Sequence, residues 1–351
     1  MGSPSGRAPA DDHVLYLDNE AVLAHLAGVD VVAVVAAVLA AHRDGRTVLP
    51  EEAALYWPTP AGATARSLAL PALVEGSGGP VAGLKVINAN PANVSRGLPR
   101  ASGILVLFDP ETARVTAVLQ AEHISSRRTA AVTAVAVRHL APGARSLALI
   151  GCGALARAHL DVCPAELADL TTLTLFDLER GRAEALAAEA RRRPELAGVE
   201  VAVAPGARAA VEGSEVVVPV TTVTEPYITA DWLAGTRLVV NVSLDDCARD
   251  VFQDCDVLVV DDWDLVAADT RRLLGVLAAE GAVTPPGSPA GGGGRPVDAT
   301  LGDVMASGPR PSNGELVVVN PFGMGVHDVA LGGEVLARAT RGGRGGLRLS
   351  R

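Results

Sequence analysis

Residues 147–160, LALIGCGALARAHL, carry the pattern that decides the fold of this chain. An apolar run ends at Gly151 and a helix is expected from Ala154, which predicts a strand, a tight turn and a helix. With Ala156 the two glycines form a GxGxxA pattern: Gly151 permits the turn, Gly153 lets backbone N–H groups reach a pyrophosphate, and the alanine allows close helix–strand packing. The positive end of the helix would then face the phosphates. The stretch therefore predicts a dinucleotide site.

An acidic residue at the end of the next apolar run strengthens this prediction. Asp177 follows Gly151 by 26 positions, and a carboxylate there can accept both ribose hydroxyls, which favours NAD(H) over the phosphorylated cofactor. Arg180 and Arg182 lie nearby and would weaken that preference if they bound a phosphate. We interpret them instead as solvated residues of the following helix.

Short, continuous apolar runs follow one another from Ser146 onward, separated by amphipathic segments such as 266–280. This alternation predicts a doubly wound parallel sheet with helices on both faces. The runs are LALI (147–150), LTLFD (173–177), VEVAVA (199–204), VVVPVTT (216–222), RLVVNVS (237–243) and VLVVDD (257–262).

The part of the chain before about residue 126 has a different pattern. It predicts a helix over 29–43 and three strand-like runs, at 65–73, 81–88 and 103–109. Strand and helix return at 315–339, and such a tail often packs back on the N-terminal part. A second, discontinuous α+β domain is therefore expected beside the nucleotide-binding one.

Composition narrows the class of protein. The 351 residues carry a net charge of −10, which argues against nucleic acid and anionic membrane surfaces as partners. The four cysteines form no CxxC pair or metal-ligand cluster, so no metal is predicted and reduced thiols in a cytoplasmic protein are expected. The N-terminus lacks the apolar core of a signal peptide, and the longest apolar run, 31–41, is too short to cross a bilayer.

Lys85 stands out among the basic residues. Thirty residues are Lys or Arg, and this is the only lysine. A position that excludes guanidinium is one that needs a compact ammonium whose pKa can be lowered for proton transfer. The alternative is chance survival of a lysine at a surface site. Its place in the strand-like GLKVIN favours a site-lining role.

Other charged residues have no evident structural task. Arg127 and Arg128 begin an expected helix, where cations oppose the helix dipole, so one of them is a candidate anion ligand and surface salt bridging is the alternative. Arg100 follows the GLKVIN strand in SRGLPRASG. Asp245 and Asp246 follow a parallel strand at its carboxyl end, where ligands bind, and are candidates for proton transfer or, alternatively, helix caps.

In this order, the motifs resemble blocks of the ornithine cyclodeaminase/μ-crystallin family over about residues 14–340. The blocks are GLKVINANPANVSRGLP, SSRRTAAVTAVAVRHLAP, ALIGCGALARAHL, NVSLDD and NPFGMGVHD. The resemblance implies a homodimer with a substrate and dimerisation domain, 13–128 and 317–340, and an NAD-binding Rossmann domain, 129–316. The ends, 1–12 and 341–351, are expected to be disordered tails.

The resemblance also implies roles for single residues. Lys85 would lie beside the reacting centre, Asp246 would be the catalytic aspartate, and Arg128 would bind a substrate carboxylate. Arg66 is the nearest substitute for a second substrate-binding arginine. The implied cofactor-binding residues are Gly151, Gly153, Ala154, Leu155, Asp177, Thr221, Thr222, Ser243, Phe322, Gly323 and Met324.

Two departures point to one branch of the family. Ornithine cyclodeaminase has a threonine where this chain has Arg100, and a Cys-Pro-Gly type stretch where this chain has residues 247–249. The segments LPRASG and NVSLDD resemble those of dehydrogenases of N-(1-amino-1-carboxyl-2-ethyl)-glutamate. Those enzymes release 2,3-diaminopropionate and 2-oxoglutarate for siderophores or peptide natural products. Three carboxylates on such a substrate suit Arg66, Arg100 and Arg128.

Three alternatives stay open at this point. A cyclodeaminase would return the hydride and release ammonia, and a μ-crystallin-like protein would bind NAD(P)H without turnover. A simple amino-acid dehydrogenase or imine reductase is the third. The sequence thus predicts an NAD-dependent oxidoreductase acting on a small, carboxylate-rich amino acid.

Overall fold

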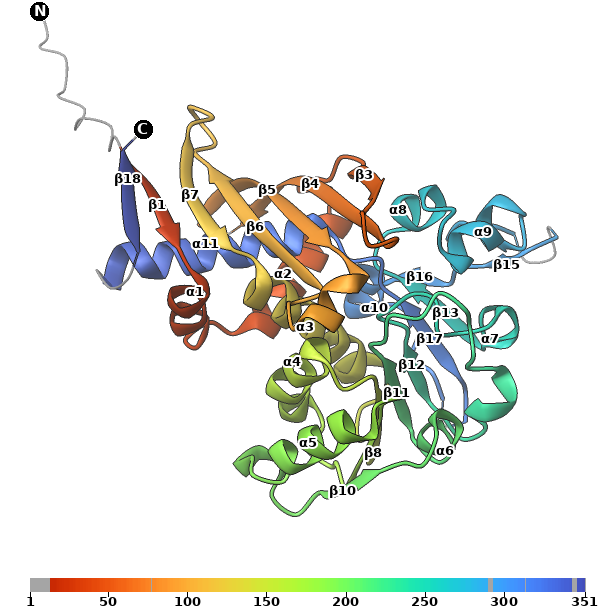
Figure 1. The fold of residues 1–351 in the computed structure, drawn as a ribbon. Helices are drawn as coiled ribbons and strands as arrows, with labels where there is room; N and C mark the ends of the chain where they lie inside the picture. The colour runs from red at the N-terminus through yellow and green to blue at the C-terminus, as the bar shows by residue number, and fades with distance from the viewer. Residues whose placement is uncertain (1–12, 77, 290–292, 313, 343–345, 351) are drawn as a thin grey trace, which may run out of the picture.

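The computed structural model describes residues 13–76, 78–289, 293–312, 314–342 and 346–350. Two eight-stranded sheets organise this part of the chain, and helices lie between and around them (Figure 1). Helix α3 (Glu122–Leu140) leads from the first sheet into the second and contacts helices of both halves.

The first sheet is mixed and takes strands from both ends of the chain. Its order is β18-β1-β7-β6-β5-β4-β2, with β3 paired to β4. β1 and β7 run parallel, and the other pairs are antiparallel. The strands are β1 His13–Leu17, β2 Thr47–Val48, β3 Ala53–Pro58, β4 Thr64–Gly76, β5 Gly79–Ala89, β6 Ala101–Phe108, β7 Val115–Gln120 and β18 Leu347–Ser350.

One long helix covers the inner face of this sheet. α11 (Gly325–Gly342) packs on β4, β5 and β6, with α1 (Asn19–Leu26) and α2 (Val31–Arg43) beside it (Figure 1). The helix lies close to the sheet: a Cβ at Gly332 would lie 2.1 Å from the Leu105 side chain, so with any larger residue either this leucine or the helix would have to shift.

The second sheet is parallel throughout, as the alternating apolar runs predict. Its order is β10-β9-β8-β11-β12-β17-β13-β16, and the order reverses between β8 and β11. The strands are β8 Ser146–Ile150, β9 Thr172–Phe176, β10 Glu200–Val203, β11 Val216–Pro219, β12 Leu238–Val240, β13 Val257–Val260, β16 Ala299–Thr300 and β17 Val317–Asn320.

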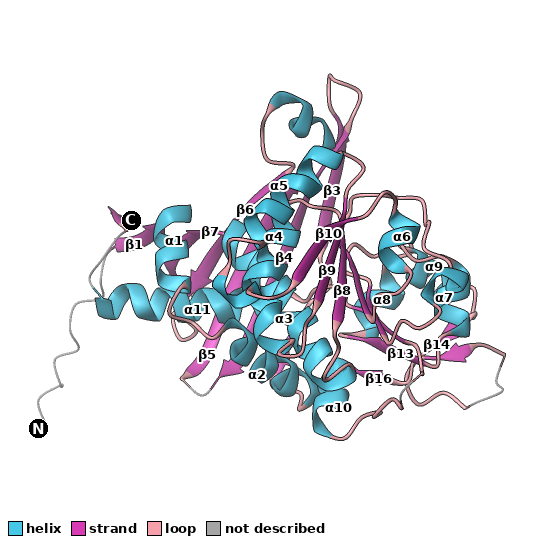
Figure 2. Ribbon diagram, turned by 90° about the horizontal axis from the view of Figure 1, so that it is seen from below, coloured by secondary structure: helices cyan, strands magenta, loops and turns pink. Residues whose placement is uncertain are grey.

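Shorter elements complete this half of the molecule (Figure 2). The α-helices are α4 Ala154–Val162, α5 Arg180–Ala190, α6 Ala207–Val211, α7 Arg249–Asp254, α8 Trp263–Ala268, α9 Leu273–Ala279 and α10 Leu301–Ala306. The 3₁₀ helices of the chain are η1 Pro91–Arg96, η2 Cys163–Glu166, η3 Pro194–Leu196 and η4 Ala230–Leu233, and β14 Val283–Thr284 pairs with β15 Arg295–Pro296.

Three sequence predictions need correction. Residues 317–320 were expected with the first domain, but β17 lies between β12 and β13, as suits a run buried on both faces. The tail 341–351 was expected to be disordered, yet 347–350 pairs with β1, since its leucines alternate with polar residues. The run 266–280 breaks at 269–272 into α8 and α9. The other predicted tail, 1–12, lies outside the described residues.

Neither a single membrane-spanning helix nor a cluster of metal ligands is found among the described residues. No single described helix is long and apolar enough to cross a membrane. Helices α1 and α2 together have that length and composition, but the chain bends by 86° between them. No group of three or more His, Cys, Asp or Glu side chains is placed to hold a metal ion.

Candidate active site

Lys85 forms the centre of a buried charged cluster between the first sheet and α11. It lies in β5, opposite Leu70 of β4 and Leu105 of β6. Its Nζ donates to Oδ2 of Asp328, from the first turn of α11, at 2.6 Å. Nε of Arg128, from α3, lies 3.3 Å from the same oxygen. Three segments far apart in the sequence thus meet at one carboxylate.

Burial sets the protonation of this cluster. It lowers the pKa of Lys85 from 10.5 to about 8, although the charge of Asp328 opposes the fall and that of Arg128 adds to it. Burial also acts to raise the pKa of Asp328, but the charges of Arg128 and Lys85 outweigh it and lower that pKa. Asp328 therefore stays ionised, while Lys85 can gain and lose a proton near neutral pH.

The loop before α11 presses against Arg128. Gly323 has φ +98°, and a Cβ there would lie 2.7 Å from Nη1 of Arg128. Asp261, at the end of β13, holds this loop: its two carboxylate oxygens accept from the N–H groups of Phe322 at 2.8 Å and Gly323 at 2.7 Å. Met324 is fully buried. The predicted cofactor loop and the predicted substrate arginine are therefore in contact.

Asp246 lies in a second polar group, after β12. Its carboxylate accepts from the hydroxyls of Thr221 at 2.6 Å, of Tyr227 at 2.9 Å and of Ser243. Burial raises the pKa of Asp246, and these three hydrogen bonds oppose the rise. Ser243 also accepts from the N–H of Thr221 at 3.1 Å, and Thr222 is exposed beside it. The group is a buried carboxylate at the carboxyl end of the parallel sheet, with three hydroxyls around it.

The glycine turn has the shape that a dinucleotide needs. Gly151 has φ +93°, and a Cβ there would lie 2.9 Å from the carbonyl oxygen of Val220, so no side chain fits. A Cβ at Gly153 would meet nothing within 4 Å, and the start of α4, Ala154 and Leu155, has no side-chain cap. The turn thus offers open space beside a helix start that no side chain caps, which suits a pyrophosphate.

Asp177 lies directly beside this turn. Its Oδ2 accepts from the N–H of Cys152 at 2.8 Å, between the two glycines, and its Oδ1 accepts from Glu179. The side chain is half-buried. A carboxylate at the end of β9 suits ribose hydroxyls, so the residues present fit NAD.

Arg66 and Arg100 are half-buried guanidinium groups near the end of the first sheet. Arg66 pairs across β4 and β5 with Ala89, and it lines a hollow of about 160 Å³ with Trp57 and Asn90. Burial, then the charge of Arg272, lowers the pKa of Arg66. Burial, then Arg66 and Arg272, lowers the pKa of Arg100. Neither arginine has an ion pair within the described ranges, so both are available to a bound anion.

The structure brings some predicted residues together and not others. Lys85, Arg128 and the loop at 322–324 meet, as do Thr221, Ser243 and Asp246. These two groups share no hydrogen bond or ion pair within the part of the chain described here. Arg127, the alternative anion ligand, instead pairs with Asp161 at 3.3 Å on the surface.

Sequence reasoning missed four residues of the site. Asp328 carries the Lys85 cluster, Asp261 holds the loop, Tyr227 binds Asp246, and Arg272 pairs with Asp245. Of these four, only Asp328 could have been noticed in the sequence. It is a carboxylate on the apolar face of VHDVALGG, and a buried charge needs a partner.

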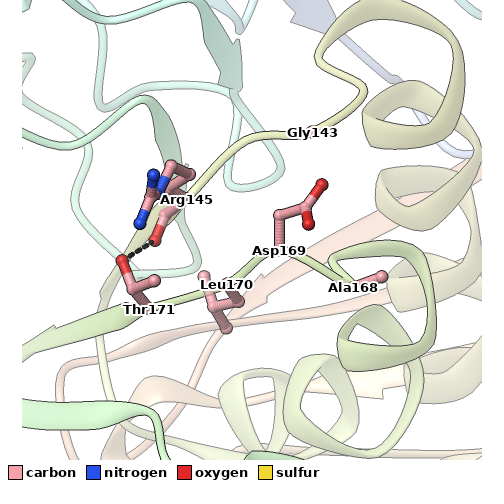
Figure 3. Close-up of a pocket in the computed structure, with 6 residues that line it drawn as sticks. All are labelled: Gly143, Arg145, Ala168, Asp169, Leu170 and Thr171. Atoms are coloured by element: carbon pink, nitrogen blue, oxygen red, sulfur yellow. Dashed lines mark hydrogen bonds between the residues drawn. The ribbon is translucent and has the colours of Figure 1, made fainter.

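A larger surface hollow of about 540 Å³ lies elsewhere. It is lined by Gly143, Arg145, Ala168, Asp169, Leu170 and Thr171 (Figure 3). One hydrogen bond lies among these residues, from Oγ1 of Thr171 to the carbonyl oxygen of Arg145 at 3.0 Å, and it joins the residue before β9 to the residue before β8. This is the amino end of the strand, opposite the Gly151 turn, so the hollow does not belong to the site.

A family model for the ornithine cyclodeaminase/mu-crystallin family matches residues 18–343. The chain belongs to this family. The match spans both sheets and therefore includes the Lys85 cluster, the glycine turn and the Asp246 group. The resemblance in the five sequence blocks is confirmed.

Curated relatives within the family differ in their activities. The N-((2S)-2-amino-2-carboxyethyl)-L-glutamate dehydrogenase of Staphylococcus aureus is 31% identical over 76% of this chain and 76% of its own. The alanine dehydrogenase of Archaeoglobus fulgidus is 26% identical over 71% and 74%. Both relatives are dehydrogenases.

Solved structures agree on the fold. The crystal structure of CmnK superposes with a TM-score of 0.87 at 41% identity, covering 97% of this chain and 98% of that one. A Δ(1)-pyrroline-2-carboxylate reductase of Thermococcus litoralis, in complex with NADH and L-proline, gives 0.82 at 21%, covering 96% and 100%. The fold class predicted from the sequence is therefore confirmed.

Proposed function

We propose that this protein is an NAD⁺-dependent dehydrogenase that oxidatively cleaves N-(1-amino-1-carboxyl-2-ethyl)-glutamate to 2,3-diaminopropionate and 2-oxoglutarate. The observation that carries the proposal is the set of guanidinium groups around the site: Arg128 beside Lys85, and Arg66 and Arg100 without ion pairs among the described residues. A substrate with three carboxylates fits this set, whereas ornithine brings a cationic tail. The dehydrogenase of Staphylococcus aureus acts on such a substrate by name.

The carboxyl edge of the second sheet would hold NAD⁺, which would supply the hydride acceptor for the glutamate Cα of the substrate. Gly151 and Gly153 make room for the pyrophosphate, the start of α4 donates N–H groups, and Asp177 accepts from the ribose. In this proposal Thr221, Thr222 and the loop 322–324 would contact the cofactor between the glycine turn and the Lys85 cluster.

Lys85 would take the proton that the substrate must lose. The secondary amine of the substrate carries two protons at neutral pH, and one must leave before the hydride can. Neutral Lys85 accepts it, and Asp328 stabilises the ammonium that results, at the 2.6 Å separation already present. Arg128 binds the adjacent carboxylate and orients the Cα–H bond.

Asp246 would activate the water that hydrolyses the iminium group. Its carboxylate takes a proton from water, the oxygen adds to carbon, and the carbon–nitrogen bond breaks after the nitrogen is protonated. One substrate, one NAD⁺ and one water give 2-oxoglutarate, 2,3-diaminopropionate, NADH and a proton. Burial suits Asp246 to this role because it raises the pKa of the carboxyl.

A homodimer through the first sheet is part of the proposal. The face opposite α11 carries apolar side chains that are partly exposed, among them Leu84, Val86, Ile104, Val106 and Val118. A second copy of the chain would cover this face. The first sheet would then form the dimer and bind substrate, while the second binds the cofactor.

The proposal is tested by NADH absorbance with purified protein, NAD⁺ and the glutamate–diaminopropionate conjugate, beside ornithine, lysine and alanine. We expect NADH with the conjugate alone. Ammonia from ornithine or lysine without net NADH would make the protein a cyclodeaminase, and NADH with alanine would make it a simple amino-acid dehydrogenase. Cofactor binding without any turnover would leave a binding protein of the μ-crystallin kind.

A further inference from the structure

The turn between α8 and α9 reaches across from the second sheet to the first. Arg271 of this turn bonds the hydroxyl of Tyr56 in β3 and pairs with Glu52 at 3.1 Å. Its guanidinium also lies 5.2 Å from the Tyr56 ring centre and pairs with Asp269 at 2.5 Å. The turn is thereby fixed beside β3 and β4, the part of the first sheet that carries Arg66.

The next residue of the turn, Arg272, extends in another direction. Its Nη1 pairs with Oδ2 of Asp245, a carboxylate that is 5% exposed and precedes the proposed catalytic Asp246. Arg66 is the register partner of Tyr56, which Arg271 bonds, and the charge of Arg272 acts on both Arg66 and Arg100. Three guanidinium groups from separate segments therefore act on one another, and one of them, Arg272, is paired with the residue before Asp246.

The arginines around this turn carry more positive charge than the carboxylates beside them can pair. Asp269 and Glu52 pair with Arg271, and Asp245 pairs with Arg272, which leaves Arg66 and Arg100 without an ion pair in the described ranges. Like charges held together with half-buried side chains repel each other unless an anion lies between them. A carboxylate of the substrate is the anion that the proposed reaction supplies.

We propose that Arg272 is a specificity-determining residue that binds, with Arg66 and Arg100, a substrate carboxylate remote from the reacting carbon. This rests on the proposed function for the identity of the substrate. Two sources have this chemistry: the side-chain carboxylate of the glutamate half and the carboxylate of the diaminopropionate half. Asp245 positions Arg272 and keeps its guanidinium aimed at the site.

Binding of the two products, measured by calorimetry on the full chain with NAD⁺ present, tests this assignment without requiring turnover. 2-Oxoglutarate is compared with 2-oxopentanoate, which lacks the side-chain carboxylate. 2,3-Diaminopropionate is compared with ethylenediamine, which has no carboxylate. We expect the wild type to prefer the carboxylate-bearing member of one pair by about tenfold or more, as a lost charge-assisted hydrogen bond implies. Arg272→Gln should remove that preference, and the pair affected identifies the source.

Two companion variants keep the result interpretable. Arg249→Gln removes an arginine of similar charge from an exposed pair with Glu280 and should leave both preferences intact. Because Arg272→Gln leaves Asp245 buried without a partner, the double variant Asp245→Asn/Arg272→Gln, which removes both charges, serves if the single variant unfolds. Equal preferences in the wild type and the Arg272 variants, or no preference in the wild type, would overturn the assignment. If Arg272→Gln removes the preference but the wild type does not turn over the conjugate, the proposed function is refuted and the role of Arg272 in carboxylate binding stands.

Discussion

Lys85 explains why a chain that otherwise uses arginine keeps one lysine. Its side chain is 2% exposed, and its pKa of about 8 lies where an ammonium can release a proton. A guanidinium keeps its charge under the same burial because its intrinsic pKa is far higher. The proposed proton transfer would account for this lysine, since Arg128 already supplies a fixed positive charge beside it.

Replacing Lys85 by arginine should abolish this transfer while keeping the charge. We expect Lys85→Arg to lower kcat by about 10²- to 10⁴-fold, the usual contribution of general acid–base catalysis. Steady-state NADH formation measures the effect, and NADH binding followed by fluorescence, which should be unchanged, is the control. Full turnover by this variant would show that Lys85 carries no proton.

The pH dependence follows from the same pKa. Because the proposed mechanism needs neutral Lys85 to accept the proton, kcat/KM should rise with pH and level off above about pH 8. Asp328 raises the pKa of Lys85, so Asp328→Asn should move the inflection to lower pH. A profile measured from pH 6 to about pH 10 tests both. A rate that falls through pH 8, or an inflection that moves upward, would contradict the assignment.

Asp246 should act after the hydride step. Asp246→Asn would leave the first oxidation intact but slow hydrolysis, so we expect a burst of NADH near one equivalent per site followed by turnover slower by about 10²-fold or more. Rapid-mixing absorbance measures both phases. Loss of the burst by the same factor as the steady-state rate would place Asp246 in the oxidation step instead.

Among the elements, the loop from Pro321 to Met324 lies between Asp261, which follows a strand of the second sheet, and Arg128 of the Lys85 cluster. Asp261 fixes it from β13, and Gly323 touches Arg128 with a backbone geometry that disfavours any side chain. The sequence block NPFGMGVHD marked this loop as important. It gave no sign of Asp261, because this carboxylate binds two backbone N–H groups 61 and 62 positions away, a contact that follows only from the folded chain.

Gly323→Ala should damage binding more than folding. The added Cβ would displace Arg128, so we expect KM for the substrate to rise by about tenfold or more, with about 1–2 kcal/mol lost from the free energy of unfolding. Gly198→Ala is the matched control because its φ is +88° with nothing within 4 Å of a Cβ. Thermal unfolding and KM are measured for both. A similar KM in the two variants would mean that Arg128 does not position the substrate.

For the whole molecule, local patterns predicted the parallel sheet well and the connections between sheets poorly. Apolar runs such as 147–150 and 216–219 lie within the second sheet because buried parallel strands are apolar on both faces. The strand at 347–350 was missed because four residues after a Gly/Arg-rich stretch gain stability only by pairing with β1. The pairs that build the site, such as Lys85 with Asp328, join residues 243 positions apart.

The same distances explain how much of the site could be predicted. Lys85, Arg128 and Asp246 could be predicted because the sequence around each of them made a charge there unexpected. Arg272 could not be predicted, because the sequence of its segment indicated one amphipathic helix. Only the folded chain shows the break at 269–272 and the effect of its charge on Arg66. Partners that act through tertiary contact leave no periodic signal.

The central claim is oxidative cleavage, and the most direct test follows the hydrogen on the glutamate Cα. The conjugate is deuterated at that carbon and incubated with NAD⁺, and the products are quantified by mass spectrometry. We predict deuterated NADH, 2-oxoglutarate and 2,3-diaminopropionate in equal amounts. Deuterium retained in an amino-acid product, or ammonia released without reduced cofactor, would contradict the account.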